Sequence, residues 1–149
     1  MSKKARMQRA KDMGFDTDKV WYHGTNEDFD AFRNNWNGNF FTDDPDFASE
    51  FGNVGGYYLR SDRPASIDGQ FRSWNEIDEI AGDKTLDELR AIARRPIYTP
   101  DVVAEAARKA GYDQVDINKI YEGESLTNQR VALNPSNIRS INAEFDPRS

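Results

Sequence analysis

The sequence contains no cysteine and a single histidine, His23. The absence of thiols excludes a disulfide framework and a thiolate metal site, and one imidazole is too few for a multi-histidine zinc site. No apolar run is long enough to span a membrane, and Met1–Lys4 lead into a charged segment rather than the apolar core of a signal peptide. These absences predict a cytoplasmic protein with no membrane partner and no bound metal.

A glycine-rich fingerprint of the GxGxxG kind is also missing, which argues against a Rossmann domain. The 149 residues carry a formal charge of −6, so their long-range field would repel nucleic acid and anionic lipid. Residues 2–13 form a basic segment that we interpret as a solvated helix, with contact to an acidic partner or nucleic acid as the alternative. Length and composition predict one domain over residues 1–149.

The remaining patterns predict an α+β domain with strands towards both ends and helices gathered between them. Apolar periodicity, capping residues and terminal glycines predict helices at 2–13, from 44 to 51, around 74–80, around 86–93, and from 99 to 110. Short β-branched and aromatic runs predict strands at 20–22, 39–42, 57–60, 114–117, 119–121, 129–133 and 138–141, with a further edge at 64–67. Residues 52–56 are predicted to be a loop, and residues 68–110 to be helical in character.

The tripeptide His23-Gly24-Thr25 is placed by this pattern at the end of a strand. A glycine lets the backbone approach a ligand closely, while an imidazole and a hydroxyl offer directional hydrogen bonds. The tripeptide therefore favours a small-molecule site. The alternative is a lone histidine in an ordinary strand-to-loop turn.

Three segments taken together resemble the ADP-ribosyltransferase fold, and more closely the small transferase domains of phage polyvalent proteins and related bacterial toxins. The segments are residues 9–17 leading into 22–25; residues 38–43 through 48–52, followed by 57–60; and residues 129–135 with 138–140 and 145–147. The resemblance covers most of the chain apart from the helical middle. It implies a split β-sheet with an N-terminal helix and a helical middle segment, and a cleft that binds NAD as co-substrate.

The resemblance also implies roles for individual residues, in the branch whose three motif positions are His, Tyr and Glu. His23 falls on the first position, where the imidazole and the neighbouring Gly24 and Thr25 backbone hold the adenosine ribose and the nicotinamide amide. Phe40, beside Phe41, falls on the second position, and Phe51 falls on the aromatic that stacks against the nicotinamide ring. Gln129 falls on the third.

The three motif positions therefore read His-Phe-Gln in this chain, since Phe40 replaces Tyr and Gln129 replaces Glu. A phenyl ring can still stack, and a carboxamide can still accept a hydrogen bond from the ribose 2′-hydroxyl. Loss of the carboxylate would cost about 2–4 kcal/mol of transition-state stabilisation. Glu122 and Glu124 are the reserve candidates for a catalytic carboxylate, and the alternative for both is a solvated turn.

The sequence thus leads to an NAD-dependent mono-ADP-ribosyltransferase with a macromolecular acceptor, a protein rather than a nucleic acid, in a phage or bacterial effector or toxin. The alternatives are an inactive member that binds NAD or ADP-ribose, and an NAD glycohydrolase. For the diphosphate of NAD we expect local donors rather than a global field. The candidates are the backbone at Gly24 and Asn26, and the side chains of Thr25, Arg33 and Arg60.

Overall fold

The computed structural model describes residues 1–25, 32 and 38–143, and it confirms the α+β class. Its helices are α1 (Lys3–Asp12), α2 (Pro45–Ser49), α3 (Lys84–Ala93) and α4 (Pro100–Lys109), with 3-10 helices η1 (Trp74–Glu79) and η2 (Pro135–Asn137). Its strands are β1 (Asp16–Thr25), β2 (Asn39–Thr42), β3 (Asn53–Leu59), β4 (Pro64–Ser73), β5 (Gln114–Glu122), β6 (Ser125–Ala132) and β7 (Ile138–Ser140). No helix within this described part is long and apolar enough to cross a membrane.

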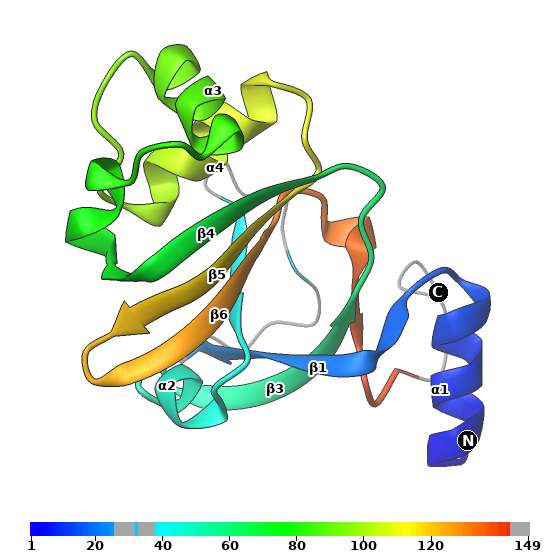
Figure 1. Cartoon of the computed structure of the whole chain (residues 1–149). Coiled ribbons are helices and arrows are strands. Elements are labelled where there is room, and N and C mark those ends of the chain that lie inside the picture. Colours follow the sequence, from blue (N-terminus) through cyan, green and yellow to red (C-terminus); the bar gives the residue numbers. More distant parts are fainter. Residues whose placement is uncertain (26–31, 33–37, 144–149) are drawn as a thin grey trace.

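The seven strands form one sheet in the order β4-β5-β6-β2-β1-β3-β7. The sheet bends sharply at β2, so that β4, β5 and β6 run steeply across β1 and β3 (Figure 1). β1 and β2 share one register pair, Tyr22 with Thr42, whereas β2 pairs with β6 along its full length. This bend produces the two halves of the sheet, and β2 joins them.

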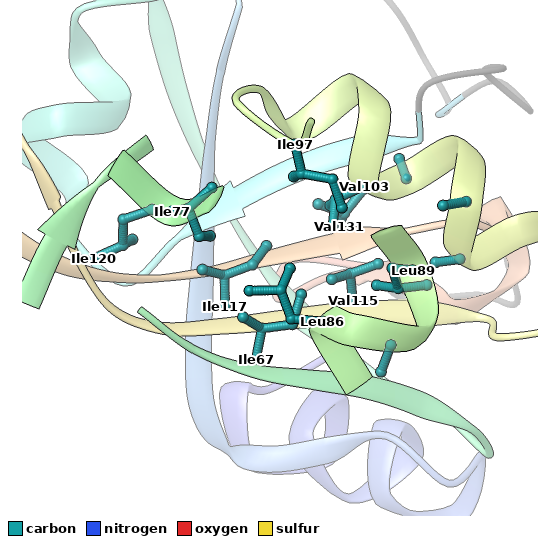
Figure 2. Close-up of a cluster of buried hydrophobic side chains, with 14 of the residues drawn as sticks. Ile67, Ile77, Leu86, Leu89, Ile97, Val103, Val115, Ile117, Ile120 and Val131 are labelled. Atoms are coloured by element: carbon teal, nitrogen blue, oxygen red, sulfur yellow. The ribbon is translucent and has the colours of Figure 1, made fainter. Parts of the chain in front are cut away.

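The larger hydrophobic core lies between α3, α4 and the β4–β6 half of the sheet. Ile67, Val115, Ile117 and Val131 project from the strands towards Leu86, Leu89 and Val103 of the helices (Figure 2). These side chains are fully buried, and each contributes about 1.5–3 kcal/mol relative to an exposed position. The helical middle of the chain is therefore held firmly against one face of the sheet.

A second cluster lies on the opposite face and contains Trp21, Phe41, Leu59, Ala132 and Ile138. Its member Ala132 directly follows Val131, which belongs to the larger core. Successive side chains of a strand point to opposite faces, so β6 forms a wall shared by the two cores.

Several predicted boundaries are wrong. His23, Gly24 and Thr25 lie inside β1 rather than beyond its end, because they pair with residues 53–55 of β3, which had been assigned to a loop. β4 continues to Ser73, whereas the sequence from Asp68 onwards was expected to be helical. β5 runs from 114 to 122 and β6 begins at Ser125, so most of the segment left between the expected strands at 119–121 and 129–133 is a β-hairpin.

Candidate functional site

A cavity of about 330 Å³ opens where the sheet bends. Its walls come from β1, β2, the end of β5, β6, α2 with the residues after it, and the first turn of α4. The lining residues are Tyr22, His23, Gly24, Phe40, Phe41, Thr42, Phe47, Ala48, Phe51, Pro100, Asp101, Glu122 and Gln129. Seven residues singled out from the sequence thus meet in one place: His23, Gly24, Phe40, Phe41, Phe51, Glu122 and Gln129.

His23 is held against β2 by its imidazole. Nδ1 lies 2.7 Å from the Phe40 carbonyl oxygen, which can only accept a hydrogen bond, so Nδ1 carries the proton. The ring also packs edge-on against Phe32, with centroids 5.1 Å apart, and tilted against Phe41 at 5.6 Å. These contacts fix the orientation of the imidazole in the cavity wall.

Phe51 stands at the mouth of the cavity and is 55% exposed. It follows α2, which begins where the Asp44 carboxylate accepts hydrogen bonds from the backbone N–H groups of Asp46 and Phe47, with Pro45 in the first turn. Phe47 packs edge-on against Phe51, with ring centroids 5.3 Å apart. One exposed ring supported by another provides a surface on which a planar ligand can stack.

Gly24 is required by the packing of β1 against α2. A Cβ atom there would lie 1.9 Å from the Ala48 carbonyl oxygen, so the glycine accommodates the backbone of α2. Whether it also approaches a ligand stays a prediction. The close approach of β1 and α2 sets the position of Phe51 relative to His23.

Gln129 is 5% exposed and has its carboxamide oriented by two neighbours. The indole Nε1 of Trp74 donates to Gln129 Oε1 at 3.2 Å, and Gln129 Nε2 donates to Glu122 Oε1 at 2.7 Å. An indole N–H is a donor only, so it requires the amide oxygen on its side and leaves the NH₂ group facing Glu122. Gln129 therefore links Trp74 to a carboxylate in the cavity wall.

The charge of the lining is negative. Asp101, in the first turn of α4, and Glu122, at the end of β5, supply carboxylates, and the described lining includes no Lys or Arg. Such a wall favours positive charge inside the cavity over negative charge.

Sequence reasoning missed Trp74, Asp101 and Phe47 at this site. The i, i+4 spacing of Phe47 and Phe51 was a usable local signal, whereas Trp74 and Asp101 depend on long-range packing.

Other candidates lie elsewhere. Arg60, expected near the diphosphate, instead donates to the carbonyl oxygens of Met13 and Ser136 and packs over the ring of Phe15, which anchors the end of α1. Thr25 and Glu124 do not line the cavity. Asn26, Arg33 and the 145–147 tail lie outside the described residues.

Within residues 1–25, 32 and 38–143, no group of three or more acidic or histidine side chains could hold a metal ion.

A family model described as ADP-ribosyltransferase in polyvalent proteins matches residues 3–146. No curated protein matches the chain. One solved structure, titled "Crystal structure of an anti-CRISPR protein", aligns with 81% of this chain and 93% of its own at 18% identity and a TM-score of 0.44.

Proposed function

Because the chain belongs to the family of ADP-ribosyltransferases in polyvalent proteins, we propose that it transfers ADP-ribose from NAD to a macromolecular acceptor. The family membership makes it a transferase-type domain. The observation that supports the finer proposal is the single cavity that brings together His23, Phe51 and Gln129 in a wall with two carboxylates. Each of these groups suits one part of the reaction.

Breaking the nicotinamide–ribose bond creates positive charge on the ribose, so the protein must orient the ring, bind the ribose and favour that charge. We assign the stacking of nicotinamide to Phe51, with Phe40 and Phe41 completing the apolar wall. We assign hydrogen bonding to the adenosine ribose and the nicotinamide amide to His23, whose ring is already fixed by Phe40. The acidic lining favours a cationic transition state.

The size of the cavity supports the nicotinamide end of NAD as its occupant. Ligand sites usually measure about 300–1,000 Å³, and 330 Å³ lies at the lower end of that range. Nicotinamide with its ribose would occupy such a space, while the diphosphate and the adenine would extend out of it. The lack of Lys and Arg in the described lining agrees with a diphosphate bound outside this cavity.

For the acceptor we propose a protein rather than a nucleic acid. The chain carries a formal charge of −6, and the cavity wall adds Asp101 and Glu122 beside the reacting ribose, so an approaching phosphate backbone would be repelled. On the basis of the same family, we also propose that the protein is a phage or bacterial effector or toxin and that it acts in the cytoplasm.

The test is an NAD turnover assay with purified protein. Mass spectrometry of released nicotinamide, together with transfer of labelled ADP-ribose to proteins of a bacterial lysate, should both be positive. His23→Ala should reduce both signals while the circular dichroism spectrum of the variant stays that of the wild type. Release without transfer would instead identify an NAD glycohydrolase. Binding of NAD without release would identify an inactive member of the family.

A further inference from the structure

We infer that Glu122 is the carboxylate that stabilises the developing positive charge on the ribose, and that Gln129 is a positioning residue that holds Glu122 in place. The inference rests on the proposed function, because it concerns the same cavity and the same reaction. The family resemblance placed the residue that stabilises the ribose charge at position 129 on β6. The inference places it at Glu122, on the neighbouring strand β5.

The environment of Gln129 argues against a direct role at the ribose. Its Oε1 accepts from the Trp74 indole at 3.2 Å, and its Nε2 donates to Glu122 at 2.7 Å and lies 3.4 Å from Thr127 Oγ1. Both polar atoms of the amide thus have protein partners. The side chain is neutral and 5% exposed, so it can contribute little to a cationic transition state.

Glu122, unlike Gln129, is charged and has only one of its two polar side-chain atoms bonded to a described residue. Glu122 lines the cavity, and within the described part of the chain its Oε1 accepts one hydrogen bond, which Gln129 Nε2 donates at 2.7 Å. No salt bridge to a described Lys or Arg neutralises it. One oxygen is held by the protein and Oε2 is left for a ligand, which is the arrangement expected of a preorganised charge.

The position of Glu122 depends on a chain of contacts that starts in the helical middle of the protein. Arg90 of α3 donates to the carbonyl oxygens of Asp78 and Ile80, at 2.6 and 2.7 Å, and so fixes η1 and the residue after it. η1 begins with Trp74, whose indole orients Gln129, and Gln129 in turn orients Glu122. Through this series of hydrogen bonds, the buried Gln129 connects the helical middle of the protein to the Glu122 carboxylate.

In the proposed step the C1′–N bond of NAD breaks, and its electron pair leaves with nicotinamide, which becomes neutral. The ribose C1′ then carries positive charge opposite the Glu122 carboxylate. A lone pair on the acceptor nucleophile forms the new bond to C1′, and the acceptor releases its proton to Glu122 or to water. The carboxylate forms no bond to C1′ at any stage.

The decisive experiment compares Glu122→Gln with Glu124→Gln in the full chain, by nicotinamide release and by calorimetric NAD binding. The amide of E122Q keeps an acceptor for Gln129 but loses the charge, so turnover should fall about 100- to 1,000-fold with NAD affinity nearly unchanged. Glu124 is exposed in the hairpin turn and does not line the cavity, so E124Q should behave as the wild type. Glu122→Asp, which restores the charge on a shorter side chain, should recover part of the rate.

The role of Gln129 is tested with Gln129→Leu, which removes the donor to Glu122. We expect the turnover number to fall while the dissociation constant for NAD stays within a factor of two of the wild type. An equal loss of turnover and affinity would show that Gln129 contacts NAD itself, and would overturn its positioning role.

The outcomes separate the inference from the proposed function. Nicotinamide release that is undiminished in E122Q would overturn the inference and leave the transferase proposal intact. A wild-type protein that neither releases nicotinamide nor transfers ADP-ribose would overturn both.

Discussion

The carbonyl oxygen of Ala48 lies where a side chain on Gly24 would have to begin, 1.9 Å from an ideal Cβ position. The two backbones therefore pack directly against each other, one in β1 and the other in α2. Since Phe51 follows α2 and His23 precedes Gly24, this contact sets the separation of the ring proposed to stack on nicotinamide from the imidazole proposed to bind its amide.

Gly24→Ala should test that contact. The methyl group cannot fit unless α2 moves, and overpacking of this kind costs about 1–3 kcal/mol. Urea unfolding should show the loss, and NAD affinity should fall with it because Phe51 is displaced. Ser49→Ala, an exposed change on the same helix, is the control and should affect neither quantity appreciably. Wild-type stability in G24A would mean that α2 does not pack this closely.

Phe51→Ala should weaken NAD binding. Aromatic stacking contributes about 0.5–1.5 kcal/mol, so the dissociation constant should rise roughly two- to twelvefold. Phe71→Ala provides a matched control, because Phe71 is 58% exposed, similar to Phe51 at 55%, but does not line the cavity. Equal effects of the two changes in a calorimetric titration would contradict the stacking role.

Gln129→Glu should change the pH profile of the reaction rather than accelerate it. The new carboxyl would lie within hydrogen-bond distance of Glu122, and two such groups share a proton instead of both ionising readily. The acid limb of nicotinamide release should therefore move to higher pH. The other titratable side chains of the described lining, Tyr22, His23 and Asp101, are the same in both proteins, so the wild type is the reference. A faster reaction with an unmoved limb would place position 129 at the ribose.

Asp78 should contribute stability that depends on pH. The Ile97 backbone N–H and then Arg90 hold the pKa of the Asp78 carboxyl below its ordinary value. A lowered pKa means that the carboxylate stabilises the fold above the pKa of the unfolded chain, about 3.9, and that this stabilisation is lost as the pH falls through the folded value.

Asp78→Asn should accordingly lower the free energy of unfolding at pH 7 by about 1 kcal/mol, and the difference from the wild type should narrow below about pH 4. Asp87→Asn removes an exposed partner of the same arginine and should have a smaller effect at pH 7. Chemical denaturation at both pH values measures the two variants. A difference that stays constant with pH would contradict the assigned charge.

Local patterns in the sequence predicted the elements that depend on local physics. α3 and α4 have apolar stripes, and α4 has Pro100 at its start and Gly111 after its end, so their positions were predicted closely. The β4 strand was missed beyond Ile67 because its register is interrupted after Asp68 and because Gln70 and Phe71 have positive φ angles. Such a bulge hides the twofold alternation from which strands are inferred.

Some residues of the candidate site could be predicted from the sequence, and others could not. His23, Phe51 and Gln129 were expected to converge, and they line one cavity. Two residues could not be found from the sequence: Trp74, which contacts Gln129, and Asp101, which lines the cavity. Their places depend on packing of the helical middle against the sheet. The contact of Gln129 with Glu122 was equally hidden, since it depends on the pairing of two strands across a hairpin.

Because side chains alternate between the two faces of β6, the charge next to the cavity depends on the register of the β5–β6 hairpin. Val131 and Gln129 face the helices, whereas Ala132 and Arg130 face the other cluster, where the Arg130 guanidinium stacks on Trp21. A slip of one residue at the Gly123 turn would exchange these faces and deliver a guanidinium to the place of the carboxamide. The register of this hairpin therefore decides whether a neutral amide or a guanidinium stands beside Glu122.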